Sequence, residues 1–228
     1  MKNSQLLIAF AFLLISCSQN FTNTHKMYKG APAKNESIGF VKLGEAFMLT
    51  RANWFAEKLS LNEDSIYKDL ENISDSIIYS ELSKQWSLSA VPANKRESFS
   101  RETLKMDKTI FIKTRLPEQG IEVANENGVV PNYLFIIHEY TVGTDFEAES
   151  FYDYTKANLE MTQSKKVKNL SIIATWTLWD NKKQIPLKSG IASSQTPIKN
   201  DSIDMNLFIK ATKTVIEQCL KKLYLSLS

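Results

Sequence analysis

The side chains best suited to acid–base chemistry follow the apolar run Tyr133–Ile137. This run is apolar at consecutive positions, which indicates a strand covered on both faces and makes it the candidate for the central strand. Sites often lie beyond the carboxyl end of such a strand, where His138 and Glu139 stand. His138 could act as a base with Glu139 or Asp145 in an envelope hydrolase or metal-dependent enzyme. Adjacent strand residues point to opposite faces, however, so we do not expect His138 and Glu139 to converge.

The densest acidic group could in principle hold calcium. A calcium loop of the EF-hand kind needs glycine at its sixth position and a carboxylate at its twelfth, where this chain has Ser150 and Lys156. The pattern instead predicts a helix over residues 146–161, with acids at its positive end. We therefore expect no metal site and no bound cofactor here. The acidic group consists of Asp145, Glu147, Glu149 and Asp153.

The remaining reactive or aromatic side chains favour packing over catalysis. The sequence has no glycine-rich phosphate loop, no metal-binding histidine or cysteine pair and no nucleophile elbow. Cys219 shares a helical stripe with apolar residues, which indicates a buried thiol. Alternation along the strand 169–179 places Trp176 inside and Trp179 outside, so Trp179 is the candidate for a stacking contact with a ligand. The enzymatic alternative stays open, but these observations favour a non-catalytic protein.

The N-terminus has the pattern of a secretion signal. Lys2 precedes the apolar run Leu6–Ile15, which is too short to span a bilayer. The sequence Leu14-Ile15-Ser16-Cys17 resembles the bacterial lipobox. The resemblance implies that residues 1–16 are cleaved and that Cys17 carries the lipid, which with two or more acyl chains would hold the protein on the membrane.

The residues after the lipobox indicate where the domain lies. Residues 17–36 are polar and are expected to form a flexible lipidated tether. Ser18 stands where Asp is the inner-membrane retention signal in enteric bacteria, and no acidic run follows Cys17. By that resemblance the lipoprotein is expected at the outer membrane of a Gram-negative bacterium, with residues 37–228 forming a single periplasmic domain.

The composition argues against a nucleic-acid partner and against a disulfide. Removing Lys2 with the signal lowers the formal net charge from +3 to +2, so nothing indicates the basic face that a nucleic-acid partner requires. Acylation would consume the thiol of Cys17 and leave Cys219 as the only other cysteine, which excludes an intramolecular disulfide. The fold must then rest on its apolar core.

Hydrophobic periodicity predicts an α/β or α+β sandwich. We expect a mixed sheet of about five strands covered by about three helices, one of them a C-terminal amphipathic helix. Residues 45–59 are ambiguous, and residues 93–108 suit a loop or short helix. Strands are predicted at 37–43, 86–91, 109–113, 133–137, 169–179 and 185–192, and helices at 62–84, 146–161 and from about 201 to 225.

The hairpin 174–192, with the C-terminal helix after it, resembles envelope lipoproteins of the LpoB, CsgG and TolB N-terminal type. The resemblance implies a fold and carries no functional residue. Together with the anchor, it leads us to expect a non-catalytic binding or accessory factor with a protein partner in the cell envelope. An enzyme using His138 with nearby carboxylates, or a carrier of a hydrophobic ligand between sheet and helices, are the alternatives.

Overall fold

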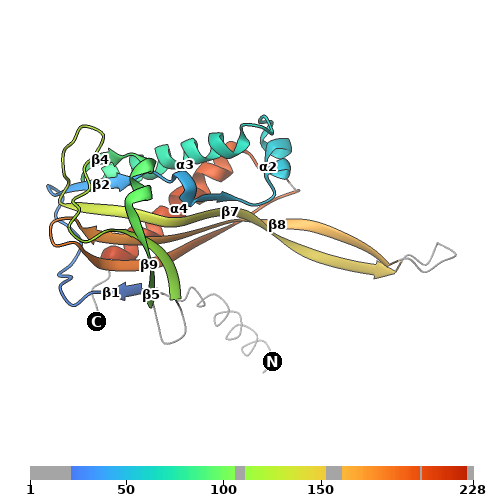
Figure 1. The fold of residues 1–228 in the computed structure, drawn as a ribbon. Helices are drawn as coiled ribbons and strands as arrows, with labels where there is room; N and C mark the ends of the chain where they lie inside the picture. Colours follow the sequence, from blue (N-terminus) through green and yellow to red (C-terminus); the bar gives the residue numbers. More distant parts are fainter. Residues whose placement is uncertain (1–21, 106–110, 153–160, 201, 225–228) are drawn as a thin grey trace, which may run out of the picture.

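The chain folds into an α+β structure built on a mixed sheet of seven strands, which is larger than the expected five (Figure 1). The additional strands β1 and β3 are three residues each, too short to show a hydrophobic period. The computed structural model describes residues 22–105, 111–152, 161–200 and 202–224, with residues 146–152 and 161–166 described by their backbone alone.

The described elements alternate irregularly between strand and helix along the chain. The sheet strands are β1 (Thr22–Thr24), β2 (Ser37–Val41), β3 (Phe47–Leu49), β4 (Ser87–Val91), β7 (Tyr133–Tyr152), β8 (Met161–Asp180) and β9 (Ile185–Pro197). A separate two-stranded hairpin is formed by β5 (Phe99–Lys105) and β6 (Phe111–Pro117). The helices are α2 (Ala52–Leu59), α3 (Ile66–Ser83) and α4 (Met205–Tyr224), with 3-10 turns η1 (Gly44–Ala46) and η2 (Ala93–Ser98).

The sheet order is β1-β9-β8-β7-β2-β4, so the run expected to be central does lie inside the sheet. β7 pairs antiparallel with β8, and β2 runs parallel to both β7 and β4. β3 pairs with β7 further along, at residues 140–142. The long antiparallel strands β7, β8 and β9 therefore form the frame to which the shorter strands attach.

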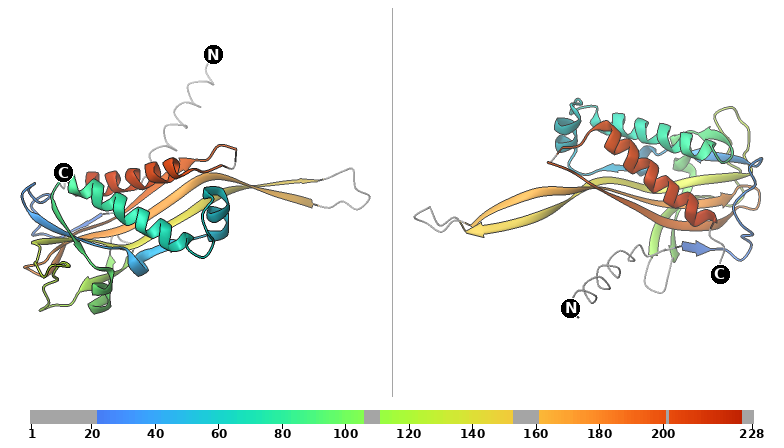
Figure 2. Two further views of the ribbon diagram at one scale, coloured as in Figure 1. Left: turned by 90° about the horizontal axis from the view of Figure 1, so that it is seen from above. Right: turned by 180° about the vertical axis from the view of Figure 1, so that it is seen from behind.

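Helices α3 and α4 lie side by side on one face of the sheet and cover its main core (Figure 2). Both helices were predicted from an apolar stripe at helical spacing, and both are confirmed. Phe208 and Cys219 of α4 are fully buried against this face, as is Trp176 of β8. The ring of Trp176 stacks on Phe135 with centroids 5.8 Å apart.

The other face carries a second, smaller core beneath the β5–β6 hairpin and the segment 118–131. Trp179 lies in this core and is only 3% exposed, so the prediction that it faces solvent is wrong. It does point away from Trp176, but the hairpin covers the face onto which it projects. Asn181 holds the covering segment in place, because its side chain bonds both the N–H and the C=O of Val123.

The outer thirds of β7 and β8 form an arm that projects from the body (Figures 1 and 2). Here the arm means residues 146–152 of β7 paired with residues 161–167 of β8. The helix predicted over residues 146–161 is therefore wrong at residues 146–152, and residues 153–160 lie outside the described part. Acidic residues near the start of a segment and a basic residue later in it favour a helix. Here the pairing of two long strands overrides this local preference.

Two features mark the base of the arm. A register shift lies between the pairs Asp145–Asn169 and Phe146–Val167, so that Lys168 is an additional residue in β8. Strand β9 ends there too, because its last pair joins Pro197 to Asn169. Bulges bend and twist a strand pair, and proline cannot donate to a further ladder bond. The arm thus begins where the body of the sheet ends.

Part of the stretch assigned to the tether packs on the domain. Strand β1 pairs with β9, and His25 donates its N–H to the C=O of Leu187. Trp86 Nε1 bonds the C=O of Pro32 at 3.0 Å. Backbone groups of a polar segment can complete a sheet edge without an apolar pattern, which explains why composition indicated a tether. Residues 17–21, with the lipobox before them, lie outside the described residues. No described helix is long and apolar enough to cross a membrane.

Candidate functional site

A β-bulge in β7 brings His138 and Glu139 to the same face of the sheet. Ile137 pairs with Trp176 and Glu139 with Thr175, so His138 is an additional residue in its strand. Two residues then stand opposite one, and the alternation of side chains shifts by one position. The prediction that His138 and Glu139 point to opposite faces is therefore wrong. Alternation along the chain cannot reveal a bulge, because the bulge depends on the partner strand.

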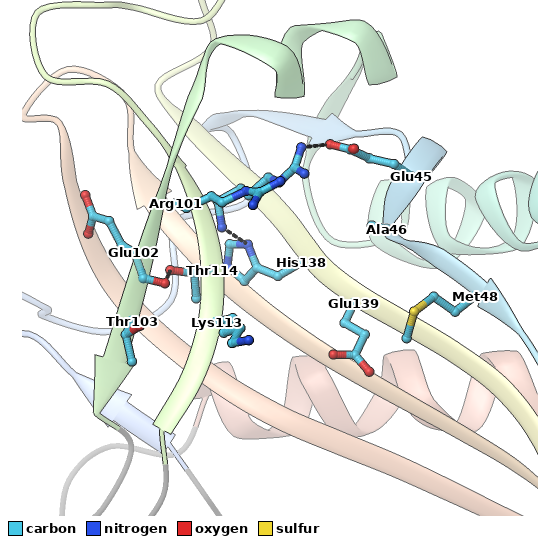
Figure 3. A pocket seen from close by; sticks show the side chains of 11 residues that line it. Glu45, Ala46, Met48, Arg101, Glu102, Thr103, Lys113, Thr114, His138 and Glu139 are labelled. Carbon is cyan, nitrogen blue, oxygen red and sulfur yellow. Dashed lines mark hydrogen bonds and ion pairs between the residues drawn. The ribbon is translucent and has the colours of Figure 1, made fainter.

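His138 and Glu139 line a pocket of about 440 Å³ between the β5–β6 hairpin and the sheet (Figure 3). Glu45 and Met48 contribute from η1 and β3, where they follow the end of β2. The remaining walls come from β5 and β6. The full lining is Glu45, Ala46, Met48, Arg101, Glu102, Thr103, Lys113, Thr114, Arg115, His138 and Glu139.

Both ring nitrogens of His138 are engaged in hydrogen bonds. The backbone N–H of Arg115 donates to Nδ1 at 3.3 Å. Because an N–H can only donate, Nδ1 is the acceptor, and the neutral ring carries its proton on Nε2. Nε2 lies 2.7 Å from Thr177 Oγ1, which lies 2.8 Å from Ser189 Oγ. The result is a polar chain that crosses β7, β8 and β9 and ties the edge of β6 to the sheet.

The environment of His138 keeps its ring neutral. Burial lowers its pKa to about 3, and the positive charge of Arg96 acts in the same direction. Arg96 is itself buried, and it donates to the carbonyls of Val41 and Lys42 at 3.0 and 2.9 Å. A ring whose lone pair already accepts an N–H is poorly placed to take a proton from a substrate.

An ion pair closes one wall of the pocket. Arg115 forms this ion pair with the carboxylate of Glu45. Opposite Arg115 in the β5–β6 ladder lies Arg101, and Thr103 lies opposite Lys113. Arg101 and Lys113 make no ion pair with any described residue. No sequence pattern indicates that these basic residues belong to a site, because they become neighbours only through the register of the hairpin.

The other predicted site residues lie apart from the pocket. Asp145 is further along β7, where Gln195 Nε2 donates to its carboxylate at 3.0 Å. Trp179 is buried in the second core, with no hydrogen-bond partner for its Nε1. Cys219 is fully buried in α4, and burial raises the pKa of its thiol to about 12. Cys17 lies outside the described residues. Among the described residues no group of three or more potential metal ligands comes together.

Fold and site together define an α+β protein with a polar pocket on the hairpin-covered face of its sheet. No family model and no curated protein sequence matches the chain. Among solved structures, it is similar to the PelC dodecamer from Paraburkholderia phytofirmans, with 10% identity over 91% of this chain and 99% of that one at a TM-score of 0.39.

A second similar structure is a homologue of a neuraminyllactose-binding hemagglutinin from Helicobacter pylori. Its identity to this chain is 12%, the TM-score is 0.40, and the match covers 88% of this chain and 89% of that one. Likeness at this level carries no functional argument, so the following proposals rest on the residues of this chain alone.

Proposed function

We propose that the protein is an outer-membrane-anchored periplasmic lipoprotein that acts as a non-catalytic binding or accessory factor in the cell envelope, and that it binds a protein partner through its arm. The observation that carries this proposal is the arm itself. Beyond Asp145 and Asn169 the two strands pair with each other and with no other described strand, because β3 ends at Leu49 opposite Val142 and β9 ends at Pro197.

Two-stranded ribbons are costly to maintain in isolation. A hairpin without a third strand or a covering helix is marginally stable in water. Both of its outer edges also offer unpaired N–H and C=O groups, to which a further strand can bond. A partner that adds a strand or covers one face would therefore stabilise the arm and explain its length.

Two observations disfavour the alternatives. Glu139 lines the pocket beside His138 and Asp145 does not, but the lone pair of His138 Nδ1 already accepts a backbone N–H, which disfavours His138 as a base. The interface between the sheet and helices α3 and α4 is packed with buried aromatic and aliphatic side chains. This packing disfavours a carrier that would hold a hydrophobic ligand there.

The arm can be tested by placing a photo-crosslinking residue at Glu149 in the lipidated full-length protein, in membranes of a Gram-negative bacterium. We expect a crosslink to one defined partner. The matched control carries the same residue at the exposed Glu217 of α4 and should give none. A second variant joins Asp145 to Val167 through a two-residue Asn-Gly turn, and it should lose the partner while keeping its unfolding midpoint. Equal crosslinking from both positions, or partner binding by the armless variant, would contradict the proposal.

The anchor is tested separately with Cys17→Ala. We expect this protein to leave the outer-membrane fraction, because a single missing thiol removes the site of acylation. A Ser18→Ala protein is the control and should remain in that fraction. If the Cys17→Ala protein remained in the outer-membrane fraction, lipid anchoring would be refuted. That result would not bear on the proposed role of the arm.

A further inference from the structure

The charges that line the pocket are balanced but not fully paired. Three basic and three acidic side chains line it, and the one ion pair among these lining residues joins Arg115 and Glu45. Arg101 and Lys113 on the hairpin make no ion pair with a described residue. On the sheet side, Glu139 is exposed and accepts a hydrogen bond from Thr141 Oγ1 at 3.0 Å. The hairpin thus offers the cations of Arg101 and Lys113, with Glu102 beside them, and the sheet offers the carboxylate of Glu139.

The ladder of the hairpin keeps the two cations close together. Since the N–H of Arg115 points to His138, Arg115 and Arg101 form a pair without mutual hydrogen bonds, in which side chains approach most closely. Like charges directly opposite each other are destabilising. Thr103 and Lys113 stand two positions along in the same arrangement. Lys113 is the diagonal neighbour of Arg101, so an anionic group bound between these two side chains would offset the positive charge that Arg101 shares with Arg115 and Lys113.

The edge of β6 adds main-chain groups to the pocket. In a strand, alternate residues direct their N–H and C=O to the same side. Because Arg115 directs its N–H away from β5, Lys113 also directs both backbone groups away from β5, toward the pocket that it lines. Such an edge can bind the amide of an extended peptide. Met48 and Ala46 provide apolar contact nearby.

We infer that the pocket binds a small zwitterion, an amino acid or a short peptide. Its carboxylate would lie at Arg101 and Lys113, its ammonium group at Glu139, and any peptide unit along the free edge of β6. A volume of about 440 Å³ suits a ligand of this size. The balanced charge of the lining distinguishes this ligand class from a polyanion or a polycation, each of which would meet like charges on one wall.

The test is calorimetric titration of the lipidated full-length protein in detergent. The probes are trialanine, its N-acetylated form and its C-terminal amide, with free alanine as the amino-acid probe. We expect trialanine to bind, and each capped form to bind about tenfold more weakly, because each lacks one charge-assisted hydrogen bond. Alanine binding as tightly as trialanine assigns the site to amino acids, whereas weaker binding of alanine assigns it to peptides.

Two variants locate the ends of the ligand. Lys113→Gln should remove the preference for trialanine over its amide, and Glu139→Gln should remove the preference for trialanine over its acetylated form. Lys113→Arg should retain binding. The controls Lys210→Gln and Glu217→Gln change the same charges at exposed positions of α4 and should leave every affinity unchanged. Unfolding midpoints of all variants show that the domain is intact.

The inference is overturned if the folded wild-type protein binds neither alanine nor trialanine up to about 10 mM, an affinity too weak for a specific site. It is also overturned if the capped probes bind as well as trialanine, or if the two substitutions change all probes equally. None of these outcomes depends on the arm, so failure here leaves the proposed function in place.

Discussion

The two faces of the sheet are covered in different ways. On one face, α3 and α4 enclose a large core that includes Phe208 and Trp176, both fully shielded from solvent. On the other face, the β5–β6 hairpin covers a small core and leaves the pocket beside it. The helix face also has polar contacts, such as the bond from Tyr140 Oη to Thr212 Oγ1 at 3.1 Å, but its core is built from aromatic and aliphatic side chains.

The hairpin face depends instead on the polar chain from His138 through Thr177 to Ser189. Apolar packing stabilises a fold but offers no polar groups to a ligand. The polar chain under the hairpin holds side chains in position, and each of its hydrogen bonds adds only modestly to the stability of the fold. The comparison indicates that stability belongs mainly to the helix face and ligand chemistry to the hairpin face.

The largest expected difference between the faces concerns core truncation. Phe208→Ala on the helix face should lower the free energy of unfolding by about 3–5 kcal/mol, because it leaves a cavity in a tightly enclosed core. Phe99→Ala on the hairpin face should cost less, about 2–3 kcal/mol, since the site at the edge of its small cluster can partly collapse. Urea unfolding of both variants measures the two costs. A larger cost for Phe99→Ala would reverse the comparison.

The second difference concerns the loss of stability at low pH, which we expect to arise on the hairpin face because His138 lies there. Its folded pKa of about 3 lies below the value of about 6.5 expected in the unfolded chain. The unfolded state therefore binds more protons between pH 6.5 and 3, so stability falls as pH falls through this window. The contribution lost between pH 7 and pH 4.5 is up to about 3 kcal/mol.

Urea unfolding of wild type and His138→Gln at these two pH values isolates this effect. The glutamine variant should lose less stability on acidification. Asp75 on α3 acts in the opposite sense, because burial raises the pKa of its carboxyl to about 6 and favours the folded state as that group takes up a proton. Asp75 is present in both proteins, so its contribution cancels in the difference. Equal acid sensitivity of the two proteins would remove His138 as the cause.

The smallest expected difference concerns two glycines, each of which lies close to a different side chain. A Cβ added at Gly190 would lie 2.7–3.0 Å from the indole of Trp176, and a Cβ added at Gly143 would lie 2.5 Å from Thr50 Oγ1. Gly190→Ala should cost about 1–3 kcal/mol, because the buried indole cannot move. Gly143→Ala should cost less than about 1 kcal/mol, since the short side chain of Thr50 can rotate.

Thermal unfolding compares the two alanine variants. Combining Gly190→Ala with Trp176→Phe should recover part of the cost, as expected for two groups in direct contact. Strictly additive effects in this double variant would show that the indole is not the obstacle.

Elements with a strong local period could be predicted from the sequence. The stripe of α3 and the alternation along residues 169–179 are such periods, and the structure confirms both. The arm could not be predicted in this way. Residues 146–152 satisfy helical preferences, but they belong to a strand because β8 offers a ladder along their whole length.

Only some residues of the candidate site could be identified from the sequence. His138 and Glu139 were identified by residue type, yet their convergence depends on a bulge that only the pairing of β7 with β8 defines. Arg101 and Lys113 meet them through the fold of a hairpin some 25 to 40 residues earlier in the chain. The prediction that Trp179 faces solvent was wrong for a related reason. Alternation indicates the face to which a side chain points, but not what covers that face.

The bulge at His138 makes the pocket separable from the rest of the fold. Ile137 and Tyr140 lie on the helix face opposite Trp176 and Ala174, so β7 without His138 would alternate regularly along β8. A protein that lacks this one residue would keep the facing of its main core, and it would lose the hydrogen bonds from His138 to Arg115 and Thr177, while Leu116 of β6 would still pack on the second core. Deletion of a single residue can thus alter the pocket while the scaffold around it is kept.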